Sequence, residues 1–395
     1  MRNHLPALPH ASLVAIASAM AMALAATPAH ADDACPRPAP QGFELKAIAP
    51  GVYAATRREP PGLLEHGNSL VVIDPQGVAV VDAQMTVAAT RELVAAIKRL
   101  TRAPVRYVIN THWHDDHVYG DDAYARAWPG VSFVSSTATR AELATRGADN
   151  RRQFLKQLPA EIALLRRQLA SGHALDPLDF GAKGPLLDAR LREAYCSDLA
   201  QAESYLATAA ATPVHLADIT VQGNLTLHLG ARELQLIEAG PAHTRGDLAV
   251  WLPDARVLAT GDAVSGVVPM AAGDADLAAW SASLANLRAL HPAFVVPGHG
   301  AVLDGEAQLA RTQALLDAVR TRATAAWKPG MDAAGLSAAV PGTDLVADWA
   351  QDDPVRQLLF RFYFLEPALA AESRRLAQGH GAAAGGIDAA AAGQS

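Results

Sequence analysis

Residues 111–120 read THWHDDHVYG and place three imidazoles and two carboxylates within the six consecutive positions from His112 to His117. Side chains of these types at such density would repel or desolvate one another if they served packing alone, whereas a divalent cation makes their convergence favourable. The preceding run, Val105–Asn110, is β-branched and aromatic, which predicts a buried strand. We therefore expect a metal site on the loop that leaves this strand; the alternative is a set of hydrogen-bonded core histidines.

The spacing within this loop supports two groups of ligands. His112 and His114 are separated by one residue and can turn to the same side of an extended segment. Asp116 and His117 can face a second point nearby once the chain curls. Zinc takes about four nitrogen, oxygen or sulfur ligands, so the others must come from elsewhere in the chain. The candidates, each after an apolar run and in a Gly-rich turn, are His243 in AGPAHTRGD, Asp262 in LATGDAVSG and His299 in VVPGHG.

The pattern HxHxDH, followed by a distant His, a Gly-Asp and a Pro-Gly-His-Gly, resembles the metal signature of the metallo-β-lactamase superfamily over roughly residues 51–304. The resemblance implies an α/β fold, the αββα sandwich, with the site at one edge of two packed sheets. It also implies two zinc ions per chain, bound by the seven residues of the signature. His112, His114 and His243 would hold one zinc, Asp116, His117 and His299 the other, and Asp262 would bridge them.

Asp82 ends the apolar run VAVVDAQ and has two readings. In the superfamily the Asp at this place supports the metal loop from behind, which is the orienting role of such partners. The alternative is that Asp82 caps the following helix, expected over 86–100.

The N-terminal segment predicts export. Residues 5–26 are apolar and Ala-rich, and Ala29-His30-Ala31 is a small-x-small cleavage site before Asp32. We therefore expect a signal peptide over 1–31, rather than a transmembrane anchor, and a mature protein that begins at about Asp32. The Ala- and Arg-rich composition suggests a GC-rich bacterium, so the expected location is the periplasm.

Composition limits the classes of partner that the chain can bind. It has 50% hydrophobic residues, 18% charged residues and a formal net charge of -7, so it lacks the excess of basic residues that binding to nucleic acid requires. A small-molecule substrate is expected. No stable membrane anchor is expected, and a homo-oligomer stays open. The two cysteines, Cys35 and Cys196, form either one disulfide or two unpaired thiols.

Hydrophobic periodicity divides the chain into several parts. A metallo-β-lactamase-like domain is expected over 41–304, interrupted by a helical insertion over 139–212 without strand signals, with helices over 150–169 and 188–211. The insertion is either a lid or substrate wall, or a stabilising appendage or dimer surface. A helical C-terminal extension follows over 305–378, with an Ala/Gly-rich disordered tail over 379–395. Strands are expected over 43–55, 69–82, 131–135, 215–216, 224–229, 233–238, 249–252, 257–260 and 294–296.

The remaining histidines lack a flanking ligand. His66 in LLEHGNS is a candidate substrate contact, because the early hairpin of the superfamily borders the pocket. His173, His215, His228, His291 and His380 are expected to be surface or core residues.

The resemblance also implies a chemistry, in which two zinc ions lower the pKa of a bridging water and create the attacking hydroxide. Asp116 is expected to orient this nucleophile besides binding metal. A bridging Asp262 favours the glyoxalase II-like branch, because many true β-lactamases lack it, whereas export favours a β-lactamase. We therefore predict an exported dinuclear zinc hydrolase of an ester, thioester, lactone or lactam bond. The alternatives are a periplasmic β-lactamase, a di-iron redox protein and a non-catalytic member of the fold, and iron or manganese would also suit the ligands.

Overall fold

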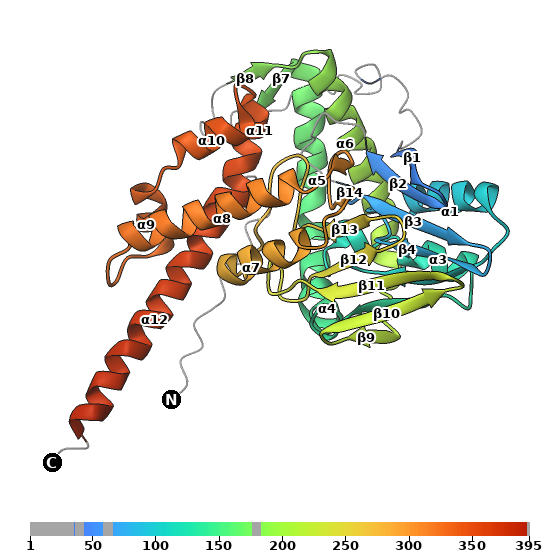
Figure 1. Cartoon of the computed structure of the whole chain (residues 1–395). Helices are drawn as coiled ribbons and strands as arrows, with labels where there is room; N and C mark the ends of the chain where they lie inside the picture. The colour runs from blue at the N-terminus through green and yellow to red at the C-terminus, as the bar shows by residue number, and fades with distance from the viewer. Residues whose placement is uncertain (1–34, 36–42, 58–65, 176–182, 393–395) are drawn as a thin grey trace. The chain divides into compact units, whose positions relative to one another are not determined.

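The structure, a computed structural model, describes residues 35, 43–57, 66–175 and 183–392 (Figure 1). The chain forms two compact units. The larger comprises 42–61, 65–147 and 212–395, and the smaller comprises 1–41, 62–64 and 148–211. The predicted signal peptide, 1–31, lies outside the described residues.

Two sheets form the centre of the larger unit (Figure 1). The first has the order β1-β2-β3-β4-β5-β6-β9, antiparallel from β1 to β4 and parallel from β4 to β9. Its strands are β1 (Phe43–Ala49), β2 (Val52–Arg57), β3 (Ser69–Asp74), β4 (Gly77–Val81), β5 (Val105–Ile109), β6 (Ser132–Ser136) and β9 (Ile219–Val221). The crossover between β4 and β5 is helix α1 (Val87–Leu100), as parallel pairing requires.

The second sheet has the order β10-β11-β12-β13-β14-β15, in which only β13 and β14 run parallel. Its strands are β10 (Asn224–Leu229), β11 (Arg232–Glu238), β12 (Leu248–Leu252), β13 (Val257–Gly261), β14 (Phe294–Pro297) and β15 (Leu303–Asp304). Helix α7 (Leu277–Arg288) connects β13 to β14.

Alternation along the strands explains why the sheets pack face to face. In β4, Val81 packs in one apolar cluster with Val250 of the second sheet, whereas Val80 packs in another with Leu93 and Ile97 of α1. Successive side chains of a strand point to opposite faces, so one face of the first sheet meets the second sheet and the other meets a helix. Two packed sheets with helices confirm the predicted fold class.

One predicted strand is wrong. Residues 215–216 form no strand, and the chain pairs only from Ile219 onward, in β9. His215 Nε2 instead lies 3.2 Å from Asp122 Oδ1, so a side-chain hydrogen bond holds this segment in place of strand hydrogen bonds.

The region after β15 is helical, as predicted. Its elements are α8 (Ala307–Ala326), α9 (Ala333–Ala339), α10 (Thr343–Ala350), α11 (Pro354–Phe360), the π-helical turn η5 (Arg361–Leu365) and α12 (Glu366–Ala392). Residues 379–392 continue α12. The disorder predicted for 379–395 stays a prediction. Residues 393–395 lie outside the described part of the chain.

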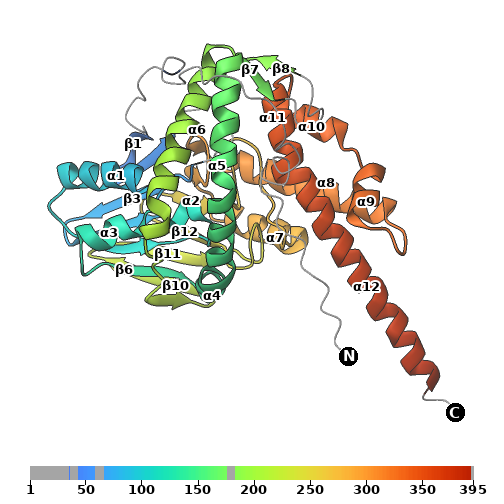
Figure 2. The same ribbon diagram turned by 180° about the vertical axis from the view of Figure 1, so that it is seen from behind.

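The smaller unit contains two long helices, α5 (Ala148–Ser171) and α6 (Ala189–Thr208), which run side by side (Figure 2). They confirm the two helices predicted for the insertion. Two short strands, β7 (His173–Leu175) and β8 (Lys183–Leu186), pair between them, although no strand was predicted there. A disulfide joins Cys35 to Cys196 of α6, with the two Cα atoms 5.7 Å apart.

The smaller unit takes in residues 148–211 of this region, whereas the insertion was predicted over 139–212. Helix α4 (Thr137–Glu142) and the π-helical turn η3 (Leu143–Gly147) belong to the larger unit. The reason is packing, because Leu143 lies in an apolar cluster with Trp113 of the metal loop. The helical pattern of α4 in the sequence is indistinguishable from that of the insertion that follows it.

Candidate metal centre

The loop after β5 carries four of the seven candidate ligands. His112 and His114 lie in its non-helical first part, and Asp116 and His117 lie in the short helix α2 (Asp115–Val118). The curl predicted for Asp116 and His117 is thus one turn of helix.

Asp82, at the end of β4, fixes this loop from behind. Its Oδ1 accepts a hydrogen bond from Thr111 N at 2.8 Å, and its Oδ2 accepts from Thr111 Oγ1 at 2.8 Å and lies 2.8 Å from His117 Nδ1. The capping alternative is wrong, because Thr86 is the residue that caps α1. Asp82 has a φ of 59°, which Asp and Asn adopt more readily than other non-glycine residues.

The other three candidates each follow a strand of the second sheet. His243 follows β11, Asp262 follows β13 and His299 follows β14. Two glycines let these ends approach one another. A Cβ on Gly298 would lie 1.9 Å from Asp262 Oδ1, and one on Gly261, which has a φ of 50°, would lie 2.4 Å from Thr111 Oγ1.

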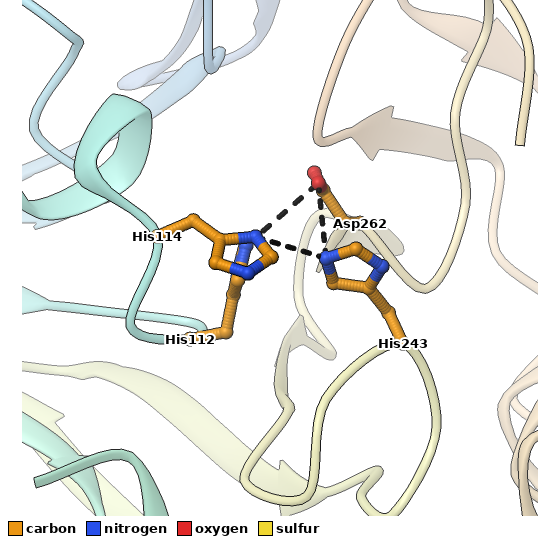
Figure 3. A group of neighbouring side chains, drawn as sticks. All are labelled: His112, His114, His243 and Asp262. Carbon is orange, nitrogen blue, oxygen red and sulfur yellow. Dashed lines mark hydrogen bonds and ion pairs between the residues drawn. The ribbon is translucent and has the colours of Figure 1, made fainter. Parts of the chain in front are cut away.

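His112, His114, His243 and Asp262 form the first group, in which one ligand atom of each lies within 4.8 Å of the others (Figure 3). His243 Nε2 is 3.1 Å from His114 Nδ1. Asp262 Oδ2 is 3.5 Å from His243 Nε2 and 3.7 Å from His112 Nε2. Three ring nitrogens and one carboxylate oxygen therefore face a common point.

Asp116, His117 and His299 form the second group. Asp116 Oδ2 lies 3.0 Å from His117 Nε2 and 3.3 Å from His299 Nε2. The other oxygen of Asp262, Oδ1, lies 3.2 Å from each of the same two nitrogens. One carboxylate thus turns one oxygen toward each group.

The inner nitrogens of the histidine rings are anchored to the fold. His243 Nδ1 lies 2.9 Å from the carbonyl of Met270, and His299 Nδ1 lies 2.9 Å from the carbonyl of His66. A carbonyl only accepts, so each Nδ1 is the protonated donor and each Nε2 carries a lone pair toward the cluster. The carboxylate of Asp82 likewise accepts from His117 Nδ1 and directs His117 Nε2 toward the cluster. Hydrogen-bond acceptors behind metal-binding histidines commonly orient the rings in this way.

The donor set fits a pair of cations. His112 Nε2, His117 Nε2 and Asp262 Oδ1 are buried and make no hydrogen bond within the described residues. Buried polar atoms are rarely left in this state, and a metal ion would satisfy all three. Nitrogen and carboxylate ligands suit zinc, iron or manganese.

Electrostatics lead to the same conclusion. Burial lowers the pKa of His112 well below its ordinary value, and burial together with the neighbouring His243 lowers the pKa of His114 to about 3, so both rings are neutral and free to act as ligands. Burial alone would lower the pKa of His117, but the carboxylates of Asp116, Asp262 and Asp82 outweigh it and hold that pKa well above its ordinary value. The second group therefore favours a positive charge, which either a proton or a metal ion supplies.

The structure brings together all seven residues predicted from the sequence. Their roles as ligands, and the catalytic role of Asp116, stay predictions. The prediction for His66 concerned its side chain, whereas the contact that the structure shows is made by its carbonyl. Substrate contact by His66 is untested.

Sequence reasoning missed the partners that hold the site together. Asn68 donates from its side chain to the carbonyls of Pro297 and Gly300 at 2.8 Å each, which fixes the turn that carries His299. The only signal in the sequence is an Asn directly before a strand, and that pattern does not single out this role.

Two packed sheets with a His and Asp cluster at their strand ends define a metal-binding α/β protein. A model of the metallo-beta-lactamase superfamily matches residues 63–299, more than half of the chain. The chain therefore belongs to the metallo-β-lactamase superfamily, whose members are mostly hydrolases.

Individual relatives are distant. A linear primary-alkylsulfatase from a Pseudomonas species is 23% identical over an alignment of 237 residues that covers 58% of this chain and 41% of that protein. The chain thus spans about two fifths of the length of this relative. Among solved structures, a metallo-β-lactamase from Pontibacter korlensis is 21% identical with a TM-score of 0.47, over 70% of this chain and 99% of that chain. The DIM-1 metallo-β-lactamase is 20% identical with a TM-score of 0.47, over 70% and 97%.

Proposed function

We propose that this protein is a dinuclear zinc hydrolase that cleaves an ester, thioester, lactone or lactam bond. The observation that supports this best is the position of Asp262, with Oδ2 toward His112 and His243 and Oδ1 toward His117 and His299. A carboxylate in this position joins two metal sites rather than serving one.

His112, His114 and His243 would hold one ion, and Asp116, His117 and His299 the other. Zinc bound there would lower the pKa of a water molecule toward neutrality and polarise the bond to be cleaved. The side chain of Asp116 is 20% exposed, whereas that of Asp262 is 3% exposed. The cluster is therefore open to solvent on the side of Asp116, where this carboxylate would orient the attacking water.

A sulfate ester is a second candidate substrate, because the curated relative is an alkylsulfatase. Sulfate esters are also hydrolysed by attack on a polarised centre, but their negative charge sets them apart from lactones and thioesters. A β-lactam stays the alternative that export suggests.

Export to the periplasm through the signal peptide at 1–31 is part of the proposal. The disulfide between Cys35 and Cys196 supports it, because such bonds persist in oxidising compartments. Within the described residues, no helix combines the length and the apolar character needed to span a bilayer.

The test is elemental analysis of the protein from Asp32 onward, paired with turnover of a cephalosporin, a lactone, a thioester and a linear alkyl sulfate. About two zinc per chain and hydrolysis of one substrate, lost in His114→Ala, would support the proposal. The preferred substrate would then separate a lactamase from an esterase or a sulfatase. Absence of bound transition metal after reconstitution would refute it, and two iron ions with redox activity would favour the redox alternative.

A further inference from the structure

Arg146 lies in the π-helical turn η3 and contacts three segments that carry or support the first group of candidate ligands. π-Helical turns are rare and often occur at functional sites. We propose that Arg146 is a positioning residue for the group formed by His112, His114 and His243. This inference rests on the proposed function, because it assumes that the group binds a metal ion.

The first contact is with the metal loop. The guanidinium of Arg146 lies 5.2 Å from the centre of the Trp113 ring, and Trp113 stands between His112 and His114 in the sequence. The Trp113 ring packs edge to face against the His114 ring, with the ring centres 4.4 Å apart. A planar guanidinium stacks on an aromatic face, so Arg146 limits the positions open to Trp113 and, through it, to His114.

The second contact leads to the turn that carries His243. Arg146 Nη1 donates to Glu142 Oε1 at 3.1 Å, and Arg245 Nε donates to the same oxygen at 2.9 Å. The side chain of Glu142 is only 2% exposed. A buried carboxylate requires positively charged partners, so it holds both arginines in place, and Arg245 is two residues from His243.

The third contact leads to the loop behind His243. Arg146 Nη1 donates to Asp274 Oδ2 at 2.5 Å. In the same loop the carbonyl of Met270 lies 2.9 Å from His243 Nδ1, and Asp276 N donates to the carbonyl of Ala242 at 3.2 Å. The orientation of the His243 ring thus depends on a loop that Arg146 ties down.

These contacts converge on one pair of side chains. His114 and His243 come from the first and second sheets, and their facing nitrogens are 3.1 Å apart. Arg146 is connected to His114 through Trp113, and to His243 through Glu142 and Asp274. The contacts described above involve none of the second group, Asp116, His117 and His299.

The test uses Co²⁺ as the probe, added to metal-free protein and followed by its visible absorption. His114→Ala identifies which of the two bound equivalents belongs to the first group. In Arg146→Ala we expect that equivalent to bind about tenfold more weakly, at the lower end of the effect of outer-shell changes, with a shifted spectrum. The other equivalent should keep its affinity and spectrum. Arg146→Lys keeps the charge but not the planar guanidinium. Its affinity for the first equivalent should lie between that of the wild type and that of Arg146→Ala.

The matched control is Arg322→Ala, because Arg322 of α8 forms an exposed two-point ion pair at 2.7 Å with Asp344 of α10, and this pair includes none of the candidate ligands. Thermal unfolding of each metal-free variant checks that the fold is retained, and Arg146→Lys supplies the comparison if Arg146→Ala does not fold. Unchanged affinity and spectrum of both equivalents in the variant that folds would overturn the role of Arg146 and leave the proposed function intact. Failure of the wild type to bind any Co²⁺ would overturn the proposed function, and this inference with it.

Discussion

Asp82 Oδ2 lies 2.8 Å from His117 Nδ1, and the same carboxylate accepts two hydrogen bonds from Thr111. All of these groups are buried. One side chain at the end of β4 therefore sets both the path of the metal loop and the direction in which His117 presents Nε2.

Asp82→Asn should weaken metal binding at the second group while the fold persists. Asn accepts the positive φ of this position, but its NH₂ group has to replace one acceptor oxygen and will oppose a donor of Thr111 or His117. We expect the affinity for one zinc equivalent to fall 10- to 100-fold, measured by competition with a chromophoric chelator. Asp74→Asn, at the half-buried end of β3, is the control. Equal affinities in wild type and Asp82→Asn would show that this carboxylate does not orient His117.

Asp262→Asn should affect both metal ions, whereas His114→Ala should affect one. Asp262 faces both groups, whereas the amide of Asn offers an oxygen to only one of them, and that oxygen lacks the negative charge of the carboxylate. We expect zinc content to fall from about two to below one per chain in Asp262→Asn and to about one in His114→Ala, by elemental analysis after equilibrium dialysis. Loss of a single equivalent in both variants would argue that Asp262 belongs to one site only.

Gly298→Ala should disrupt the site and destabilise the protein. A Cβ there would lie 1.9 Å from Asp262 Oδ1 and 2.8 Å from the backbone carbon of Gly261, so the chain has to move. We expect a loss of about 1–3 kcal/mol in the free energy of unfolding, as for other overpacked core positions. Gly130→Ala is the control, since its added Cβ meets nothing within 4 Å, and it should be neutral or slightly stabilising. Equal stability of the two variants would mean that the strand ends at Gly298 are looser than the structure shows.

The candidate site could be predicted from the sequence because its residues stand where the pattern of the chain changes. His243, Asp262 and His299 each follow an apolar run and lie in a glycine-containing turn, and such positions mark strand ends. The atoms that orient the histidines could not be predicted. Met270 and His66 contribute backbone carbonyls from 27 and 233 residues away, and a carbonyl has no signature in the sequence.

The differences between the predicted and the observed boundaries have a similar origin. The helical pattern from 139 onward gave no reason to separate α4 from the insertion, whereas the packing of Leu143 with Trp113 places α4 in the larger unit. In the tail, the low complexity of 379–395 predicted disorder, whereas residues 379–392 continue α12.

Glu161 in α5 should make the stability of the metal-free protein depend on pH. Burial raises the pKa of Glu161 to about 7, and its Oε1 is buried and makes no hydrogen bond within the described residues. Because the pKa of the carboxyl group is higher in the folded state than in the unfolded state, the folded protein prefers the protonated form of Glu161. Its contribution to stability is therefore complete below the unfolded pKa near 4.5 and is lost as the pH rises through about 7.

Glu161→Gln removes this dependence, because the amide does not ionise. The variant should match the wild type at pH 5 and exceed it at pH 8 by about 2 kcal/mol, a figure discounted from 1.4 kcal/mol per pKa unit because the side chain is only partly buried. The measurement is urea unfolding of the metal-free protein at both pH values. The control is Glu203→Gln, which removes an exposed carboxylate of the same unit that pairs with Arg166 at 2.6 Å and should show no such gain at pH 8. If the free energies of unfolding of wild type and Glu161→Gln differ by the same amount at pH 5 and pH 8, Glu161 ionises in the folded protein as it does in water. The smaller unit would then be open to water around α5 at neutral pH.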